Sequence, residues 1–104
     1  MGFKDPKDCH SLEELRNEID KIDEHIILLF AERHKYVEAV VRFKNDKDAI
    51  IAQERKDAVI QQRRDWAESK GLNADVFEQI YTLLVESNIK HEMNLLKNKN
   101  NSNV

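Results

Sequence analysis

The chain has 104 residues, enough for one small domain, and contains only 2 glycines and 1 proline. Charged residues make up 36% and hydrophobic residues 40%, a mixture that favours long amphipathic helices over a sheet. A net charge of -3, with no long run of like charges, argues against binding to nucleic acid or to a membrane surface. A single cysteine, Cys9, excludes an internal disulfide.

The beginning of the chain has no apolar run, so we expect neither a signal peptide nor a membrane span, but a soluble cytoplasmic protein. Residues 1–10 form a polar lead, and the expected helical domain covers residues 11–97. Ser11 and Glu14 match a capping box, in which each side chain bonds the other residue's backbone N–H. A helix from about 12 to 44 follows, because one apolar face recurs every three or four residues. This face carries Leu15, Ile19, Ile22, Ile26, Leu29/Phe30, Arg33, Val37, Val40 and Lys44.

Two further helices are expected, from about 50 to 69 and from about 74 to 97. Gly71 stands where a left-handed cap would end the second helix, and Asn73 can cap the start of the third. The face of the second helix reads Ile51, Arg55, Val59, Gln62 and Trp66, and that of the third reads Phe77, Tyr81, Leu84, Asn88, Glu92 and Leu95.

The asparagine-rich residues 98–104 are expected to be a disordered tail, which gives no sign of a second domain. The predicted fold is therefore all-α, with three helices per chain and a long first helix. Because a few long helices bury little apolar surface in a lone chain, we expect self-association as an intertwined homodimeric helical bundle.

Polar and charged residues interrupt all three apolar faces. Arg33 and Lys44 are 11 residues apart, so on a straight helix they lie within about 20° of one face and about 16 Å apart along the axis. Arg55 lies on the second face, and Asn88 and Glu92 lie one turn apart on the third. A buried unpaired charge costs several kcal/mol, so converging cations predict a pocket for a small anion. The alternative is that each cation reaches solvent or pairs with a carboxylate, and Glu92 could itself neutralise Lys44.

Arg16 precedes Arg33 by 17 residues, or about 25 Å along a straight helix. The two arginines therefore cannot share a small ligand within one subunit. In an antiparallel dimer of long first helices, Arg16 of the partner could reach the pocket.

The ordered set of cations carries a family resemblance, which extends over about residues 5–97. The chain resembles the all-helical chorismate mutase family, and most closely its isochorismate pyruvate lyase branch. The matching stretches are Asp8-Cys9, Leu15-Arg16, Ile19-Asp20-Lys21-Ile22-Asp23, Arg33, Tyr36-Val37, Arg42-Phe43-Lys44, Glu54-Arg55, Trp66-Ala67-Glu68 and Gly71-Leu72.

The resemblance implies an interlocked homodimer with two equivalent sites and with neither a metal nor an organic cofactor. Arg16 would be donated by the partner, and Arg33 and Arg55 would hold the carboxylates of the substrate. Lys44 would face the ether oxygen of an enolpyruvyl dicarboxylate, and Glu92 would face the same oxygen. Fixed donors there stabilise the charge that develops as the ether bond breaks.

Several positions bear on the choice of reaction. Asn88 would line the pocket one turn before Glu92, which stands where the lyase pattern has Gln and where mutases also carry Glu. An ionised carboxylate has no proton to donate, so Glu92 must be protonated to assist. Because mutases also carry Glu at this position, we predict chorismate mutase first and isochorismate pyruvate lyase second. Lys56 and Ala52 replace acidic residues that bind the substrate hydroxyl in some mutases.

A third hypothesis, from another class, is a helical dimerisation or regulatory module that has lost catalysis. The four cations Arg16, Arg33, Lys44 and Arg55 argue for the enzyme.

Overall fold

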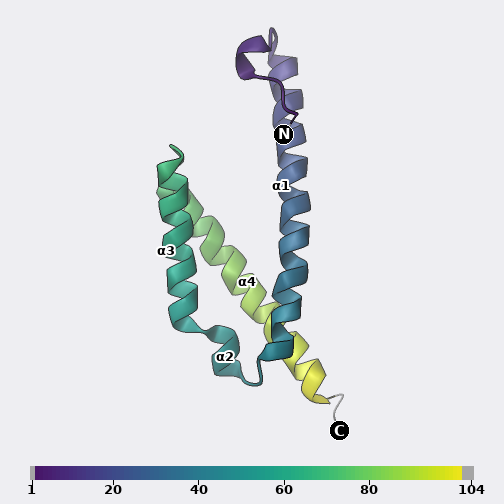
Figure 1. Ribbon diagram of the computed structural model, residues 1–104, viewed down its shortest axis with the longest axis vertical. Helices are drawn as coiled ribbons and strands as arrows, with labels where there is room; N and C mark the ends of the chain where they lie inside the picture. Colours follow the sequence, from purple (N-terminus) through teal and green to yellow (C-terminus); the bar gives the residue numbers. More distant parts are fainter. Residues whose placement is uncertain (1, 102–104) are drawn as a thin grey trace. The chain divides into compact units, whose positions relative to one another are not determined.

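A computed structural model describes residues 2–101, which form helices and connecting turns without a strand (Figure 1). The elements are η1 (Pro6–Asp8), α1 (Leu12–Val40), η2 (Val41–Phe43), α2 (Lys47–Ile51), α3 (Gln53–Ser69) and α4 (Ala74–Asn101), where η marks a 3-10 helix. The all-α prediction is confirmed. The chain divides into two compact units, the first ending at Tyr36 and the second beginning at Val37.

In the first unit, the polar lead folds back on the start of α1 (Figure 1). The Lys4 backbone N–H donates to Glu18 at 3.1 Å, and the Lys4 ammonium donates to Glu14 at 3.1 Å. Half of the predicted capping box forms, because the Glu14 N–H donates to Ser11 Oγ at 3.1 Å. The Glu14 carboxylate accepts from the His10 N–H at 3.0 Å instead of reaching back to Ser11. The lead is thus fastened to the helix by hydrogen bonds.

The first helix ends earlier than its apolar pattern predicts. α1 stops at Val40, and η2 tightens the chain before Lys44 takes an extended conformation. The Asp46 side chain accepts from the Ala49 N–H at 2.8 Å and so begins α2, which competes with continuing α1. Lys44 consequently lies outside the helix. The helical projection that aligned Lys44 with Arg33 does not apply beyond Val40.

The second predicted helix is two helices in the structure. Ala52, at φ 39° and ψ 61°, separates α2 from α3 and is the one non-glycine with positive φ within residues 2–101. The buried face of α3 also differs from the predicted one. Its more buried members are Lys56, Val59, Ile60, Arg63, Arg64 and Ala67, so of the predicted face only Val59 is buried. Trp66 is 54% exposed.

Local signals at the α3–α4 turn are confirmed. Gly71 has φ 77°, and the N–H groups of Gly71 and Leu72 donate to carbonyls of the last turn of α3 at 3.0 and 2.9 Å. Asn73 Oδ1 accepts two N–H groups of the first turn of α4. α4 packs against α3 and continues to Asn101, so residues 98–101 are helical rather than disordered. Residues 102–104 lie outside the described part of the chain.

The core of the second unit is small and lies where η2 and α2 meet α4. Val41, Ile50 and Leu96 are 5%, 2% and 5% exposed, and Ile89, Met93 and Leu95 pack against them.

Many large apolar side chains stay exposed in the single chain. On α1 they include Leu12, Ile19, Ile26, Ile27, Leu28 and Leu29, and on α3, α4 and their connection Trp66, Leu72, Val76, Ile80 and Leu83.

Candidate functional site

A part-buried ion pair joins two of the residues singled out by sequence. Lys44 Nζ donates to Glu92 Oε1 at 3.0 Å, and the two side chains are 21% and 8% exposed. The residues are 48 positions apart in the chain. Lys44 follows η2, whereas Glu92 lies in the middle of α4. The pairing therefore depends on how the elements of the second unit pack.

The core fixes the backbone on both sides of Lys44. Val41 precedes it, Ile50 follows it, and both pack with Leu96 of α4. Leu96 is one helical turn beyond Glu92, so both lie on one side of α4. The same helix thus anchors the backbone of the Lys44 segment and receives its ammonium.

Asn88 lies one turn before Glu92 on α4, and both are buried, at 8% and 6% exposure. Every buried side-chain nitrogen and oxygen within residues 2–101 has a hydrogen-bond partner. This agrees with the rule that buried polar groups are paired. The predicted face of the third helix is confirmed, since Asn88 and Glu92 occupy it among apolar neighbours.

Lys56, and not Arg55, lies on the more buried side of α3. Arg55 is exposed in the first turn of α3, while the Lys56 side chain is 20% exposed and lies 3.4 Å from Glu86 of α4. The prediction that Arg55 lies on the inner face of α3 is wrong for the single chain, because the more buried side of the helix runs through Lys56, Val59 and Ile60. Nothing local indicates the Lys56–Glu86 contact, since 30 residues separate the pair.

The remaining two predicted residues lie in the first unit, on α1. Arg16 is exposed in the second turn, and Arg33 is partly buried and takes part in an interaction. Of the six predicted site residues, the structure therefore brings Lys44 and Glu92 into contact and sets Asn88 beside Glu92.

The Lys44–Glu92 pair can bind and polarise a ligand. The ammonium has three N–H donors, of which Glu92 takes one, so others can serve an anion or an ether oxygen. Of the two alternatives left open by the sequence, the structure of the free protein has the one in which Lys44 pairs with Glu92. Ligand binding would add charge to a pair that is neutral as a whole.

Comparison with known proteins identifies the family of the chain. Residues 15–93, which include all six predicted site residues, match the family model described as chorismate mutase type II. The chain belongs to this family.

An isochorismate pyruvate lyase of Pseudomonas aeruginosa is 39% identical over 83 residues, which are 80% of this chain and 82% of the relative. A T-protein of Haemophilus influenzae is 36% identical over 83 residues, 79% of this chain but only 22% of that protein. In this family member, no helix of the described residues is long and apolar enough to span a bilayer.

Proposed function

We propose that the protein is a chorismate mutase, which converts chorismate to prephenate by a Claisen rearrangement without a cofactor. The observation that carries the proposal is the part-buried Lys44–Glu92 pair at 3.0 Å, in a chain whose residues 15–93 match the chorismate mutase type II family. Glu92 holds the Lys44 ammonium in one position, and a fixed cation is the kind of donor that the reaction needs.

The reaction needs no nucleophile and no external oxidant or reductant. The ether carbon–oxygen bond breaks while a carbon–carbon bond forms, and negative charge builds on the ether oxygen. The Lys44 ammonium donates to that oxygen, and Glu92 donates to it when protonated. Donors fixed before the reaction stabilise the transition state more than the bound substrate.

The arginines would bind the two carboxylates and hold the folded conformer of the substrate. In the proposal, Arg33 and Arg55 act in the same subunit as Lys44, and Arg16 comes from the partner in a homodimer. Asn88 lines the pocket beside Glu92. Exposed apolar side chains along α1, such as Ile19 at 54% and Leu29 at 60%, support such a dimer, which would cover them. The predicted cytoplasmic location stays a prediction.

A second candidate is isochorismate pyruvate lyase, which eliminates pyruvate from isochorismate and leaves salicylate. The P. aeruginosa relative of that name favours it, because the similarity covers 82% of that protein. Both reactions break an enolpyruvyl ether beside two carboxylates, so one pocket suits either. Their substrates differ at the ring hydroxyl, where Ala52 and Lys56 would bear on recognition.

The deciding experiment is to incubate the purified protein separately with chorismate and with isochorismate. Prephenate as the main product supports the mutase, and salicylate with pyruvate supports the lyase. Neither product at any pH from acid to neutral would contradict both and favour a non-catalytic helical module.

Mixed dimers test the shared site. Arg16→Ala and Arg33→Ala chains are each expected to be inactive, but a mixed dimer contains one site with both arginines intact. Mixing should therefore restore activity as subunits exchange. Mixing two batches of the same variant is the matched control. Exchange without recovery would rule out donation of Arg16 by the partner.

A further inference from the structure

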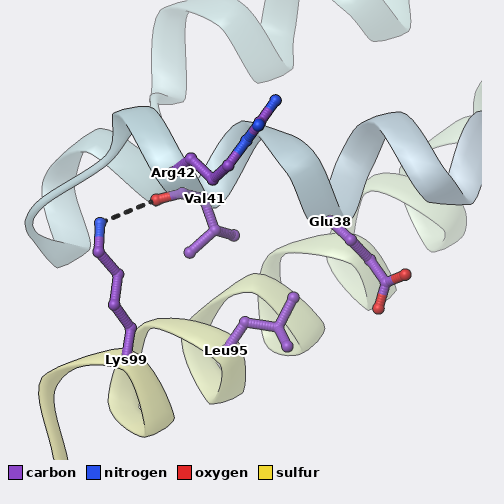
Figure 2. Close-up of a pocket in the computed structure, with 5 residues that line it drawn as sticks. All are labelled: Glu38, Val41, Arg42, Leu95 and Lys99. Atoms are coloured by element: carbon purple, nitrogen blue, oxygen red, sulfur yellow. Dashed lines mark hydrogen bonds between the residues drawn. The ribbon is translucent and has the colours of Figure 1, made fainter. Parts of the chain in front are cut away.

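The end of α4 holds the backbone turn that precedes Lys44. Lys99 Nζ donates to the Val41 carbonyl at 3.4 Å, as Figure 2 shows. The same carbonyl accepts the Lys44 backbone N–H at 3.2 Å, which closes η2. A single oxygen therefore links Lys99 to the residue that pairs with Glu92.

The Val41 carbonyl can accept a second donor beside the Lys44 N–H, because a carbonyl oxygen has two lone pairs. Basic side chains commonly donate to carbonyls near helix ends. Val41 is only 5% exposed, so water has little access to the residue. Arg42 does not take this place: its Nε donates to the Ala39 carbonyl at 3.3 Å, and its guanidinium lies 5.5 Å from the centre of the Phe43 ring.

Apolar contacts also bring η2 and the end of α4 together beside the Lys99–Val41 hydrogen bond. Val41 and Leu95 side chains line an open hollow between η2 and α4, and Lys99 forms one of its edges (Figure 2). Leu96, next to Leu95, packs on Val41 from the core. Lys99 follows Leu95 by one helical turn, so its hydrogen bond acts on a backbone segment that packing already brings close.

We propose that Lys99 is a positioning residue, which holds η2 through the Val41 carbonyl and thereby sets the Lys44 ammonium against Glu92. Lys99 does not touch the substrate. Its catalytic effect rests on the proposed function, because it acts through Lys44 at the ether oxygen. A small displacement of a catalytic group can lower the rate strongly, since the donor must be in place before the charge develops.

The test compares Lys99→Met with Lys97→Met. Both variants remove one positive charge from the end of α4, but Lys97 is exposed and its neighbour Leu96, not Lys97, packs on Val41. One hydrogen bond of this kind corresponds to about a fivefold change in an equilibrium. We expect Lys99→Met to speed hydrogen exchange of the Lys44 amide about fivefold and to lower kcat about fivefold. KM should change little, because the arginines bind the carboxylates.

Lys99→Arg should restore both values, because a guanidinium also donates to a carbonyl. Thermal melting confirms that the variants are folded, and Lys99→Leu, which also lacks a donor, serves in place of Lys99→Met if the methionine variant does not fold. Equal Lys44 exchange in Lys99→Met and Lys97→Met would overturn the link through Val41. Faster exchange with an unchanged kcat would overturn the catalytic role.

The exchange measurement needs no substrate. If the wild type turned over neither chorismate nor isochorismate, the proposed function would fail, while faster Lys44 exchange in Lys99→Met would still support the structural link.

Discussion

Replacing Glu92 by glutamine alters the charge of the candidate site without altering its size. The Glu92 side chain is 8% exposed and accepts from Lys44 at 3.0 Å. Removing one partner of a buried pair can cost about 3–5 kcal/mol. Glutamine keeps a carbonyl oxygen that can accept from Lys44, and Lys44 is 21% exposed and can reach water. We therefore expect a loss of stability of only about 1 kcal/mol, measured by urea denaturation.

The effect of Glu92→Gln on the reaction rate should be larger than its effect on stability, and it should be an increase. In the free protein the Glu92 carboxylate accepts from Lys44 and, when ionised, has no donor of its own. A glutamine could accept from Lys44 through its carbonyl and also aim an amide N–H at the ether oxygen. A hydrogen bond to a charged group contributes about 1.5–3 kcal/mol, which is about tenfold to a hundredfold in rate. Glu92→Gln should raise kcat by this factor at neutral pH.

The assay is the initial rate of prephenate formation at neutral pH. The rate of Glu92→Gln should exceed that of the wild type, because the amide N–H is a donor that an ionised carboxylate lacks. Glu78→Gln is the matched control, since Glu78 lies on the same helix and pairs with Arg64 at 3.2 Å near the surface. If Glu92→Gln kept the wild-type kcat, the role assigned to Glu92 would be wrong.

Two further predictions concern local structure. Hydrogen bonds from the His10 N–H to Glu14 and from the Lys21 side chain to Glu18 hold the pKa values of both carboxyls below their usual range. Both carboxylates also bind the lead through Lys4, so they stabilise its attachment fully at pH values above the ordinary pKa of glutamate. This stabilisation is lost as the pH falls through the lowered values, and hydrogen exchange of the Lys4 amide should accelerate there; an amide equally protected in acid would contradict the attachment. Ala52→Gly should raise the free energy of unfolding by up to about 1 kcal/mol, because a left-handed alanine costs about 1–2 kcal/mol and the added freedom of unfolded glycine offsets part of the gain. Urea denaturation measures it, and a less stable variant would show that the conformation is not strained.

The amino-acid sequence by itself determined the features that depend on a few neighbouring residues. The Ser11 cap, the left-handed Gly71 and the Asn73 cap are each formed by groups within five residues of one another, and all three are present. Helical periodicity likewise identified the face of α4 that carries Asn88 and Glu92, because many apolar residues define it.

Only the tertiary structure decided where the predicted cations go. Lys44 leaves the helix because η2 and the Asp46 cap end α1, and it meets Glu92 across 48 residues because Val41, Ile50 and Leu96 form a common core. Arg55 stays exposed because the more buried side of α3 runs through Lys56, Val59 and Ile60. Periodicity did not identify this side, since few apolar residues mark the face of α3 and its packing against α4 decides it. Contacts between distant segments depend on the packing of whole elements, and a sequence pattern describes one element at a time.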